Sequence, residues 1–413
     1  MKTNYLSRRA FLALCAPLVV SGRVLGLDGS VSPSNRLITG MIGAGNRAQD
    51  LIGEFTNCRD FYLMGICDCF PQKGSASRDR IRNLYGNDDC ILFDRYEEIL
   101  ERSDFDVTVI AAPDHWHTKL IVESCQAGKD VYSEKPLTLT LAENRTVVAA
   151  ARRFNRVVTS GSQRVMEDYG YLAPIIQSGR IGEVKEIFAE VGVAGIECTL
   201  PAEPVPEGVD WDRWLGQAPW APYNKERCSG DYGGGWRQFR EYCNGFLADW
   251  GAHKFGGSLY AVGLDAEEPV KLLQPRSGEN QSDFITLVYA NGVQLHHAPG
   301  TNYDITIVGS EGQVRHQDWG VKPLHAVDVR RYHNGATRIV DDFAFSIKHR
   351  VRPFQDVLYG ARTAAACQIF NIGYRVGRDL VWNAAQCRFE GDDDANRLVS
   401  RVQRAPYTIP TEF

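Results

Sequence analysis

From Arg36 to about Ser160 the chain alternates short apolar runs with stretches in which apolar residues recur at helical spacing. The short runs predict strands and the periodic stretches predict amphipathic helices. The strands are expected at residues 36–42, 61–68, 106–112, 130–134 and 156–160, and the helices at residues 47–55, 95–101, 117–128 and 141–153. This alternation predicts a parallel sheet with helices on both faces.

The hydrophobic pattern changes after Gln163. One more helix is predicted at residues 172–182 and one more strand at residues 184–194, and an aromatic-rich connection then runs from Glu197 to Asn244. A connection of that length inside a compact domain is usually functional or forms a lid over a site.

Further strand-like segments follow this connection, with two turn signals among them. Asn291-Gly292 and Glu311-Gly312 favour tight turns and therefore predict hairpins. The strand-like segments span residues 269–274, 283–290, 292–298 and 303–317. They predict a second α/β unit with a mostly antiparallel open sheet, and helices around residues 354–376 are expected to close the chain.

Length and composition agree with two globular domains. At 413 residues the chain is too long for one ordinary core. We expect a leader and linker at residues 1–30, a first domain at residues 31–163 and a second at residues 164–413. The formal net charge of −5, without runs of Lys or Arg, argues against binding of nucleic acid.

The N-terminal segment has the features of an export signal. The stretch "SRRAFL" at residues 7–12 places two adjacent arginines before a short apolar region. That region is shorter than the roughly 20 apolar residues that cross a bilayer, but it fits a signal peptide. Because it resembles a twin-arginine signal, we expect export to the periplasm and no stable membrane insertion after the signal is removed.

A glycine-rich turn lies between the first predicted strand and the first predicted helix. In Gly43-x-Gly45-x-x-Ala48, the first glycine permits a tight turn, the second admits a pyrophosphate, and the alanine lets helix and strand pack closely. The helix N-terminus adds free N–H groups and a partial positive charge. Asp68, at the end of the second strand, is placed to accept hydrogen bonds from ribose hydroxyls and to repel a 2′-phosphate. The pattern predicts NAD binding, with NADP disfavoured.

Two polar stretches follow later strands of the same predicted sheet. "APDHWH" occupies residues 112–117 and "EKP" occupies residues 134–136. Both lie at carboxyl ends of strands, the edge at which open α/β sheets bind ligands. Lys135 precedes a proline, which disfavours helix and holds the lysine extended in the loop. This position favours a ligand contact over a solvated ion pair of Glu134 with Lys135.

The stretch "ADWGAHKFGG" places Asp249 and His253 one helical turn apart, so that both lean over one helix face. A catalytic pair, half of a metal site and a buried hydrogen bond are the three interpretations. A metal site needs three or four ligands, and the adjacent His296 and His297 on a strand must point to opposite faces. We therefore expect no metal and favour a catalytic pair, with a purely structural Asp–His bond as the alternative.

Taken together, the glycine turn at residues 43–47, the "APDHWH" stretch and the "EKP" motif resemble the Gfo/Idh/MocA family. That family includes glucose–fructose oxidoreductase and inositol dehydrogenase, and the resemblance covers nearly the whole chain from Arg36. It implies an N-terminal Rossmann NAD-binding domain and a C-terminal α/β domain that binds substrate and carries out catalysis. The stretches "CQAGKDVYSEKP", "VDWDRWLGQAPW" and "GDDDANRLVSR" resemble its exported bacterial branch, from which Lys254 and Gly256 depart.

The resemblance also implies roles for individual residues. Lys135, Asp249 and His253 match the catalytic set of the inositol dehydrogenases. His253 is expected to remove the hydroxyl proton because histidine titrates near neutrality, with Asp249 orienting its ring and Lys135 bonding the substrate oxygen. The expected cofactor-binding residues are Gly43, Ala44, Gly45, Asn46, Arg47, Asp68, Pro113, His117, which faces the nicotinamide, Glu134 and Lys135. The candidate substrate contacts are Trp116, Arg164, Trp236, Arg237 and Tyr303.

The resemblance implies an NAD-dependent oxidoreductase that acts on a hydroxyl of a sugar or sugar derivative. Because no soluble dinucleotide pool is expected outside the cytoplasm, export implies a retained and recycled cofactor. The alternative function is NAD-assisted glycoside hydrolysis, by oxidation, elimination, hydration and reduction. A sugar-binding protein without turnover is disfavoured by the intact Lys135, Asp249 and His253. The open sheet leaves room for a homo-oligomer.

Overall fold

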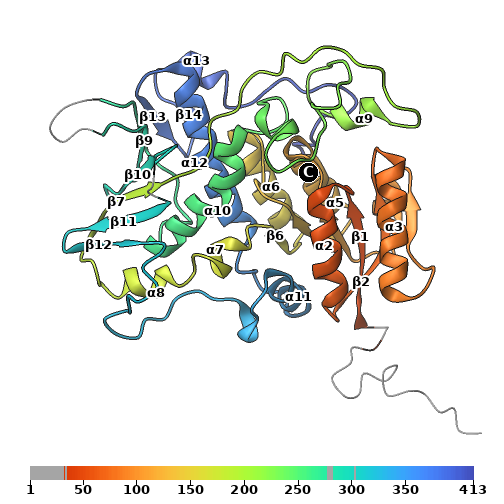
Figure 1. Ribbon diagram of the computed structural model, residues 1–413, viewed down its shortest axis with the longest axis horizontal. Helices are drawn as coiled ribbons and strands as arrows, with labels where there is room; N and C mark the ends of the chain where they lie inside the picture. Colours follow the sequence, from red (N-terminus) through yellow and green to blue (C-terminus); the bar gives the residue numbers. More distant parts are fainter. Residues whose placement is uncertain (1–31, 33–34, 277–281, 302–303) are drawn as a thin grey trace, which may run out of the picture.

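The computed structural model describes residues 32, 35–276, 282–301 and 304–413. The expected export signal and Tyr303 lie outside the described residues. Two sheets, each with its own helices, make up the described chain (Figure 1). None of the helices in these ranges has both the length and the apolar character to cross a membrane.

The first sheet is parallel throughout, with the strand order β3-β2-β1-β4-β5-β6. Its strands are β1 (Leu37–Ile42), β2 (Phe61–Cys67), β3 (Ile91–Phe93), β4 (Val107–Ile110), β5 (Asp130–Ser133) and β6 (Val158–Ser160). The strand order reverses between β1 and β4, and open sheets of this kind bind ligands in the crevice outside that point. The predicted Rossmann architecture is confirmed.

Five helices accompany this sheet, and they bury their apolar residues against it. They are α2 (Asn46–Asn57), α3 (Pro71–Tyr85), α4 (Tyr96–Glu101), α5 (Asp114–Gln126) and α6 (Leu141–Arg153). The pattern of apolar positions did not predict α3 or β3. The reason is that α3 buries only Gly74, Ser77 and Ile81 along 15 residues, and β3 has three residues.

The second sheet has the order β12-β11-β7-β10-β9-β8-β13-β14. Only β7 and β10 pair in parallel, and the other neighbours are antiparallel. Its strands are β7 (Val184–Ala189), β8 (Lys271–Leu273), β9 (Thr286–Val288), β10 (Gln294–His297), β11 (Ile305–Gly309), β12 (Gly312–Arg315), β13 (Leu380–Asn383) and β14 (Arg388–Phe389). Both predicted hairpins form, as β9–β10 and β11–β12, and the mostly antiparallel sheet is confirmed.

Two long helices, α10 (Gly245–Val262) and α12 (Val357–Val376), pack against this sheet and against each other. The glycines inside α10 allow another segment to approach closely. A Cβ at Gly257 would lie 2.6 Å from the ring of Tyr169, and one at Gly256 would lie 3.0 Å from Val165. This close packing keeps α10, which carries Asp249 and His253, seated against the start of the second domain.

The remaining helices are short or peripheral. They are α7 (Arg164–Glu167), α8 (Leu172–Gln177), α9 (Trp211–Leu215), α11 (Ile339–His349), α13 (Asp393–Asn396) and the 3₁₀ turns η2 (Gly235–Gln238) and η3 (His333–Gly335). The closing helices expected around residues 354–376 form as the single helix α12, which is not the end of the described chain. The last residues return to the first domain, where Lys119 donates to the Thr408 carbonyl at 3.2 Å and Ile409 is buried. This extended return has no apolar period that would predict it.

Candidate active site

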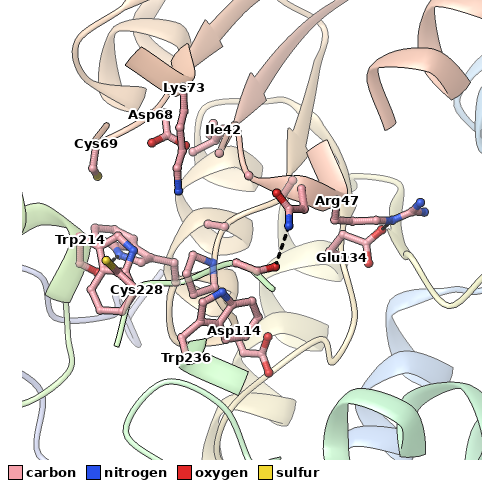
Figure 2. A pocket seen from close by; sticks show the side chains of 18 of the residues that line it. Ile42, Arg47, Asp68, Cys69, Lys73, Asp114, Glu134, Trp214, Cys228 and Trp236 are labelled. Carbon is pink, nitrogen blue, oxygen red and sulfur yellow. Dashed lines mark hydrogen bonds and ion pairs between the residues drawn. The ribbon is translucent and has the colours of Figure 1, made fainter. Parts of the chain in front are cut away.

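A cavity lies at the carboxyl edge of the parallel sheet, facing α10 of the second domain. Its walls come from the β1–α2 turn, the ends of β2, β4 and β5, and the connection after β7 (Figure 2). Among the expected site residues it is lined by Gly43, Gly45, Asn46, Arg47, Asp68, Pro113, Trp116, Glu134, Lys135, Trp236, Arg237 and Asp249. Residues from both domains therefore meet around one space, as the motifs predict.

The β1–α2 turn has the shape that a dinucleotide pyrophosphate requires. Gly43 has φ +98°, and a Cβ there would lie 2.6 Å from the Ala111 carbonyl oxygen. Gly45 is the N-cap residue before α2, and no atom lies within 4 Å of the position of a Cβ there. The first N–H groups of α2 have no side-chain cap, so they remain available to an anion. These residues fit the phosphates of a bound dinucleotide.

Asp68 links the end of β2 to this turn. Its carboxylate accepts hydrogen bonds from the Ala44 N–H at 2.6 Å and the Phe70 N–H at 2.8 Å. Burial raises the pKa of Asp68 above its ordinary value, and the two backbone hydrogen bonds and the charge of Lys73 offset part of the rise. A carboxylate offers about four lone-pair directions, so two bonds to the backbone leave capacity for ribose hydroxyls.

Replacing Asp68 with alanine is expected to raise the Kd for NAD by about tenfold to a hundredfold. The loss of a partly buried, charged acceptor costs about 1–3 kcal/mol, and the Ala44 N–H loses its partner as well. Calorimetric titration measures the change. The control is Asp89→Ala, because the Asp89 carboxylate accepts a hydrogen bond from the Tyr62 hydroxyl, outside the cavity. An unchanged Kd would remove Asp68 from the ribose site.

Lys73 is a cation at the ribose end of the cavity that the sequence analysis did not single out. Its ammonium lies 4.5 Å from the centre of the Phe70 ring, and it lines the cavity beside Asp68. In Figure 2 its side chain extends from α3 toward the middle of the cavity. A cation beside the ribose attracts a 2′-phosphate, so Lys73 opposes the preference for NAD over NADP that Asp68 indicates. The sequence pattern missed Lys73 because it belongs to α3, which has no apolar period.

Glu134 anchors the other side of the turn. Its carboxylate is buried and accepts a hydrogen bond from Arg47 Nε at 2.7 Å (Figure 2). The same guanidinium reaches Glu54 at 3.1 Å. Since Arg47 belongs to α2 and Glu134 to the end of β5, this pair ties the glycine turn to the loop that carries Lys135.

Lys135 and Asp249 form the central contact between the two domains. Lys135 Nζ donates to Asp249 Oδ1 at 2.6 Å and to the Asp249 carbonyl at 3.0 Å. Arg237 Nε lies 3.5 Å from the same carboxylate oxygen. Burial acts to raise the pKa of Asp249, but Lys135 and Arg237 outweigh it and hold the pKa below its ordinary value. An ammonium has three N–H donors, so one remains for a ligand.

His253 lies on the same face of α10 but is not bonded to Asp249. It is 5% exposed, and Nδ1 has no hydrogen-bond partner among the described residues. Burial and the positive charges of Lys135, Arg164 and Arg47 place the pKa of His253 well below its ordinary value. The expected orienting bond from Asp249 is therefore absent, because that carboxylate pairs with the ammonium of Lys135 instead. His253 is neutral and has a free ring nitrogen.

Of three further expected residues, Trp116 lines the cavity, whereas His117 and Arg164 lie outside its lining. The ring of His117 is fully buried between two carbonyls, Pro136 at 2.7 Å and Ala112 at 2.9 Å, so it joins the two ligand-binding loops behind the cavity wall. Trp116 lines the cavity, and its Nε1–H donates to the Trp214 carbonyl at 3.1 Å. Arg164 lies 5.4 Å from the centre of the Trp250 ring, on the His253 side of the site.

The long connection, residues 197–244, is here called the crossing loop. It passes over the carboxyl edge of the first domain and carries α9 toward α3 (Figure 1). The Gly230 carbonyl accepts from Asn46 Nδ2 at 3.2 Å, and Tyr232 donates to Asp50 at 3.0 Å. Arg213 binds Glu97 at 2.9 Å. The crossing loop therefore covers the cavity, as its length and aromatic content indicate.

With this geometry in place, comparison with known proteins identifies the family. Residues 37–162 match the NAD-binding Rossmann fold model of the Gfo/Idh/MocA oxidoreductase family. Residues 188–409 match the C-terminal alpha/beta domain model of the same family. The chain belongs to the Gfo/Idh/MocA oxidoreductases, and the resemblance stated from its motifs is confirmed.

Individual relatives are distant. The chain is 26% identical over 197 residues to a glycosyl hydrolase family 109 protein of Shewanella baltica, a match that covers 44% of this chain and 40% of that protein. It thus spans well under two thirds of the curated relatives it matches. The crystal structure of myo-inositol 2-dehydrogenase from Lactobacillus plantarum is similar in fold, with 18% identity, a TM-score of 0.56, and coverage of 84% of this chain and 100% of that one.

A second solved structure, the WlbA dehydrogenase of Bordetella pertussis in complex with NADH and UDP-GlcNAcA, has a TM-score of 0.58 at 18% identity. The match covers 84% of this chain and 99% of that chain. At these identities the likeness shows a shared fold. The fold and the family models therefore place this chain among oxidoreductases with a dinucleotide-binding domain and sugar dehydrogenases as structural neighbours.

Proposed function

We propose that this protein is an NAD-dependent oxidoreductase that acts on a hydroxyl group of a sugar or sugar derivative. The observation that carries the proposal is the contact of Lys135 with Asp249 across the cavity, opposite the glycine turn. This contact holds the Lys135 ammonium, a hydrogen-bond donor for the substrate oxygen, near the expected position of the nicotinamide of a dinucleotide bound at the glycine turn.

The chain's own residues supply the proton chemistry. Lys135 has one N–H left to hold the substrate hydroxyl oxygen, and it stabilises negative charge that develops there as the carbonyl forms. His253, neutral because its pKa is lowered, accepts the hydroxyl proton. Asp249 and Arg237 hold the Lys135 ammonium in place. A nicotinamide bound by the first domain supplies the hydride acceptor.

The crossing loop supports a retained cofactor. Its contacts with Asn46 and Asp50 lie over the N-terminal turn of α2, where the pyrophosphate of a dinucleotide would rest. We propose that these contacts slow the departure of the dinucleotide, in keeping with export of the folded protein to the periplasm. Trp116, Trp236 and Arg237 are the proposed ligand contacts beneath the loop.

NAD-assisted glycoside hydrolysis is the second candidate. It is favoured by the sequence likeness to glycosyl hydrolase family 109 proteins, although that likeness spans less than half of the chain. In this chemistry the same Lys135 and His253 would serve the first oxidation and the final reduction. No net change in the oxidation state of the cofactor would result.

The deciding experiment starts from protein purified without added cofactor. We expect denaturation to release close to one NAD per chain, identified by mass spectrometry, and sugars to reduce the bound dinucleotide. A glycoside that is cleaved without net reduction would instead assign the hydrolase. A protein that neither holds nor binds a dinucleotide, and is silent toward sugars and glycosides, would overturn both functions.

A further inference from the structure

Asp114 is a buried carboxyl group that none of the roles above uses. It is the first residue of α5, is 1% exposed and lines the cavity. Neither of its carboxyl oxygens accepts a hydrogen bond from an N–H or O–H group of the described residues, and the Cys243 thiol beside it is only a weak donor. In Figure 2 its side chain lies beside Trp236, across the cavity from Lys73. Because an unpaired buried carboxyl costs free energy, its position indicates a role toward what binds there.

The groups around Asp114 come from three other segments. Lys135 follows β5, Arg237 belongs to η2, and Asp249 and the Cys243 thiol come from α10 and the residues just before it. Burial is the main cause that raises the pKa of Asp114 to about 7. The Cys243 thiol, Lys135 and Arg237 lower it, and the Asp249 carboxylate adds to the rise. Near neutral pH the group is balanced between acid and carboxylate.

The proposed reaction releases the hydroxyl proton inside the cavity, and a second proton acceptor would keep it away from His253. His253 accepts the hydroxyl proton but holds it poorly, because burial and three nearby cations disfavour the imidazolium. The positive charge of Lys135 favours the carboxylate of Asp114 and disfavours the imidazolium of His253. Because the pKa of Asp114 is still raised to about 7 and that of His253 is lowered well below its ordinary value, the proton is held better on Asp114 than on His253 once the substrate hydroxyl has given it up.

We propose that Asp114 is the second proton-accepting residue of the site and holds the proton that His253 removes from the substrate hydroxyl. This inference rests on the proposed function. The substrate O–H bond breaks, its electron pair forms the carbonyl, the hydride goes to the oxidised nicotinamide, and the proton goes to His253. The imidazolium then gives up this proton and returns to neutral imidazole, and the Asp114 carboxylate takes up one proton and becomes a carboxylic acid.

The test counts protons on binding, without turnover. A positive charge in the cavity favours the Asp114 carboxylate, so NAD⁺ should expel its proton and NADH should not. For the full chain freed of bound dinucleotide, we expect NAD⁺ to release about half a proton more than NADH at pH 7. Calorimetry in buffers of different ionisation enthalpy measures this difference. It should disappear at about pH 9, where the group is already ionised.

Asp114→Asn keeps the shape of the side chain and removes the titration. We expect it to abolish the difference in proton release and to remove the acid limb near pH 7 from the profile of kcat/KM. Asp356→Asn is the control, since Asp356 is equally buried but pairs with Arg152 away from the cavity. It should retain both features.

The outcomes separate the two proposals. A full difference in proton release in Asp114→Asn, or no difference in the wild-type chain at pH 7, would overturn the role of Asp114 and leave the proposed function standing. A chain that binds neither NAD⁺ nor NADH would overturn the proposed function itself. The difference in proton release between NAD⁺ and NADH is first measured on the wild-type chain. This part of the test therefore stands even if Asp114→Asn fails to fold.

Discussion

Replacing Lys135 with methionine is expected to lower kcat by about 10²–10⁴-fold, the range that a positioned proton-transfer group contributes. The change removes the donor for the substrate oxygen and leaves the Asp249 carboxylate with Arg237, 3.5 Å away, as its one cationic partner among the described residues. Single-turnover reduction of the bound dinucleotide by a saturating sugar measures the effect on the chemical step.

Lys129→Met is the matched control for Lys135→Met. Lys129 is also a buried lysine, but its ammonium donates to the carbonyls of Arg102 and Phe105, outside the cavity. We expect this variant to lose stability and to keep its turnover per folded molecule. If Lys135→Met retained a rate within about threefold of the wild type, Lys135 would not be the group that holds the reacting oxygen.

The second large effect is expected at His253. His253→Ala should reduce turnover by about 10²–10⁴-fold while NAD binds as before, because His253 does not line the dinucleotide cavity. His253→Gln, which fills more of the space but cannot accept the proton, should be equally slow. Parallel measurements of kcat and of the Kd for NAD separate the two effects.

His297→Gln is the control for a buried histidine. His297 lies on β10, and its ring binds the Tyr374 hydroxyl at 2.7 Å and the Gly192 carbonyl at 3.1 Å, away from the cavity. Its loss should affect stability and not turnover. Wild-type activity in His253→Ala would show that His253 is a structural residue of α10, and the base would have to be sought elsewhere.

These two variants also separate the catalytic interpretation from the structural one. The structural alternative for the sequence "ADWGAHKFGG" is a buried Asp–His hydrogen bond. The structure has no such bond, since Asp249 binds Lys135 at 2.6 Å and His253 Nδ1 has no partner among the described residues. A residue kept for packing alone would gain from a hydrogen bond, so the free nitrogen favours a role in chemistry.

Much of the first domain could be predicted because its signals are local. Strand and helix periods, the glycine turn and the proline after Lys135 depend on neighbouring residues, and they led to the Rossmann sheet, the hairpins of the second domain and the family. The helix α3 escaped prediction because its polar sequence lacks an apolar period, and it is held by tertiary contacts of Gly74, Ser77 and Ile81. Lys73, which lies on this helix, was therefore not predicted as a site residue.

By itself, the sequence determined the candidate residues for cofactor binding and chemistry: the glycine turn, Asp68, Lys135 and the pair on α10. Their places at strand ends and at i,i+4 spacing follow from local periodicity, and the catalytic roles proposed for them follow from the family resemblance. The tertiary structure alone decided their partners. Lys135 and Asp249 are 114 positions apart in the sequence. The i,i+4 spacing predicts a hydrogen bond between Asp249 and His253, but in the fold the Asp249 carboxylate pairs with Lys135 instead. Burial, which no local pattern reports, raises the pKa of Asp114 at the cavity wall and lowers that of His253, because charge is costly where water is excluded.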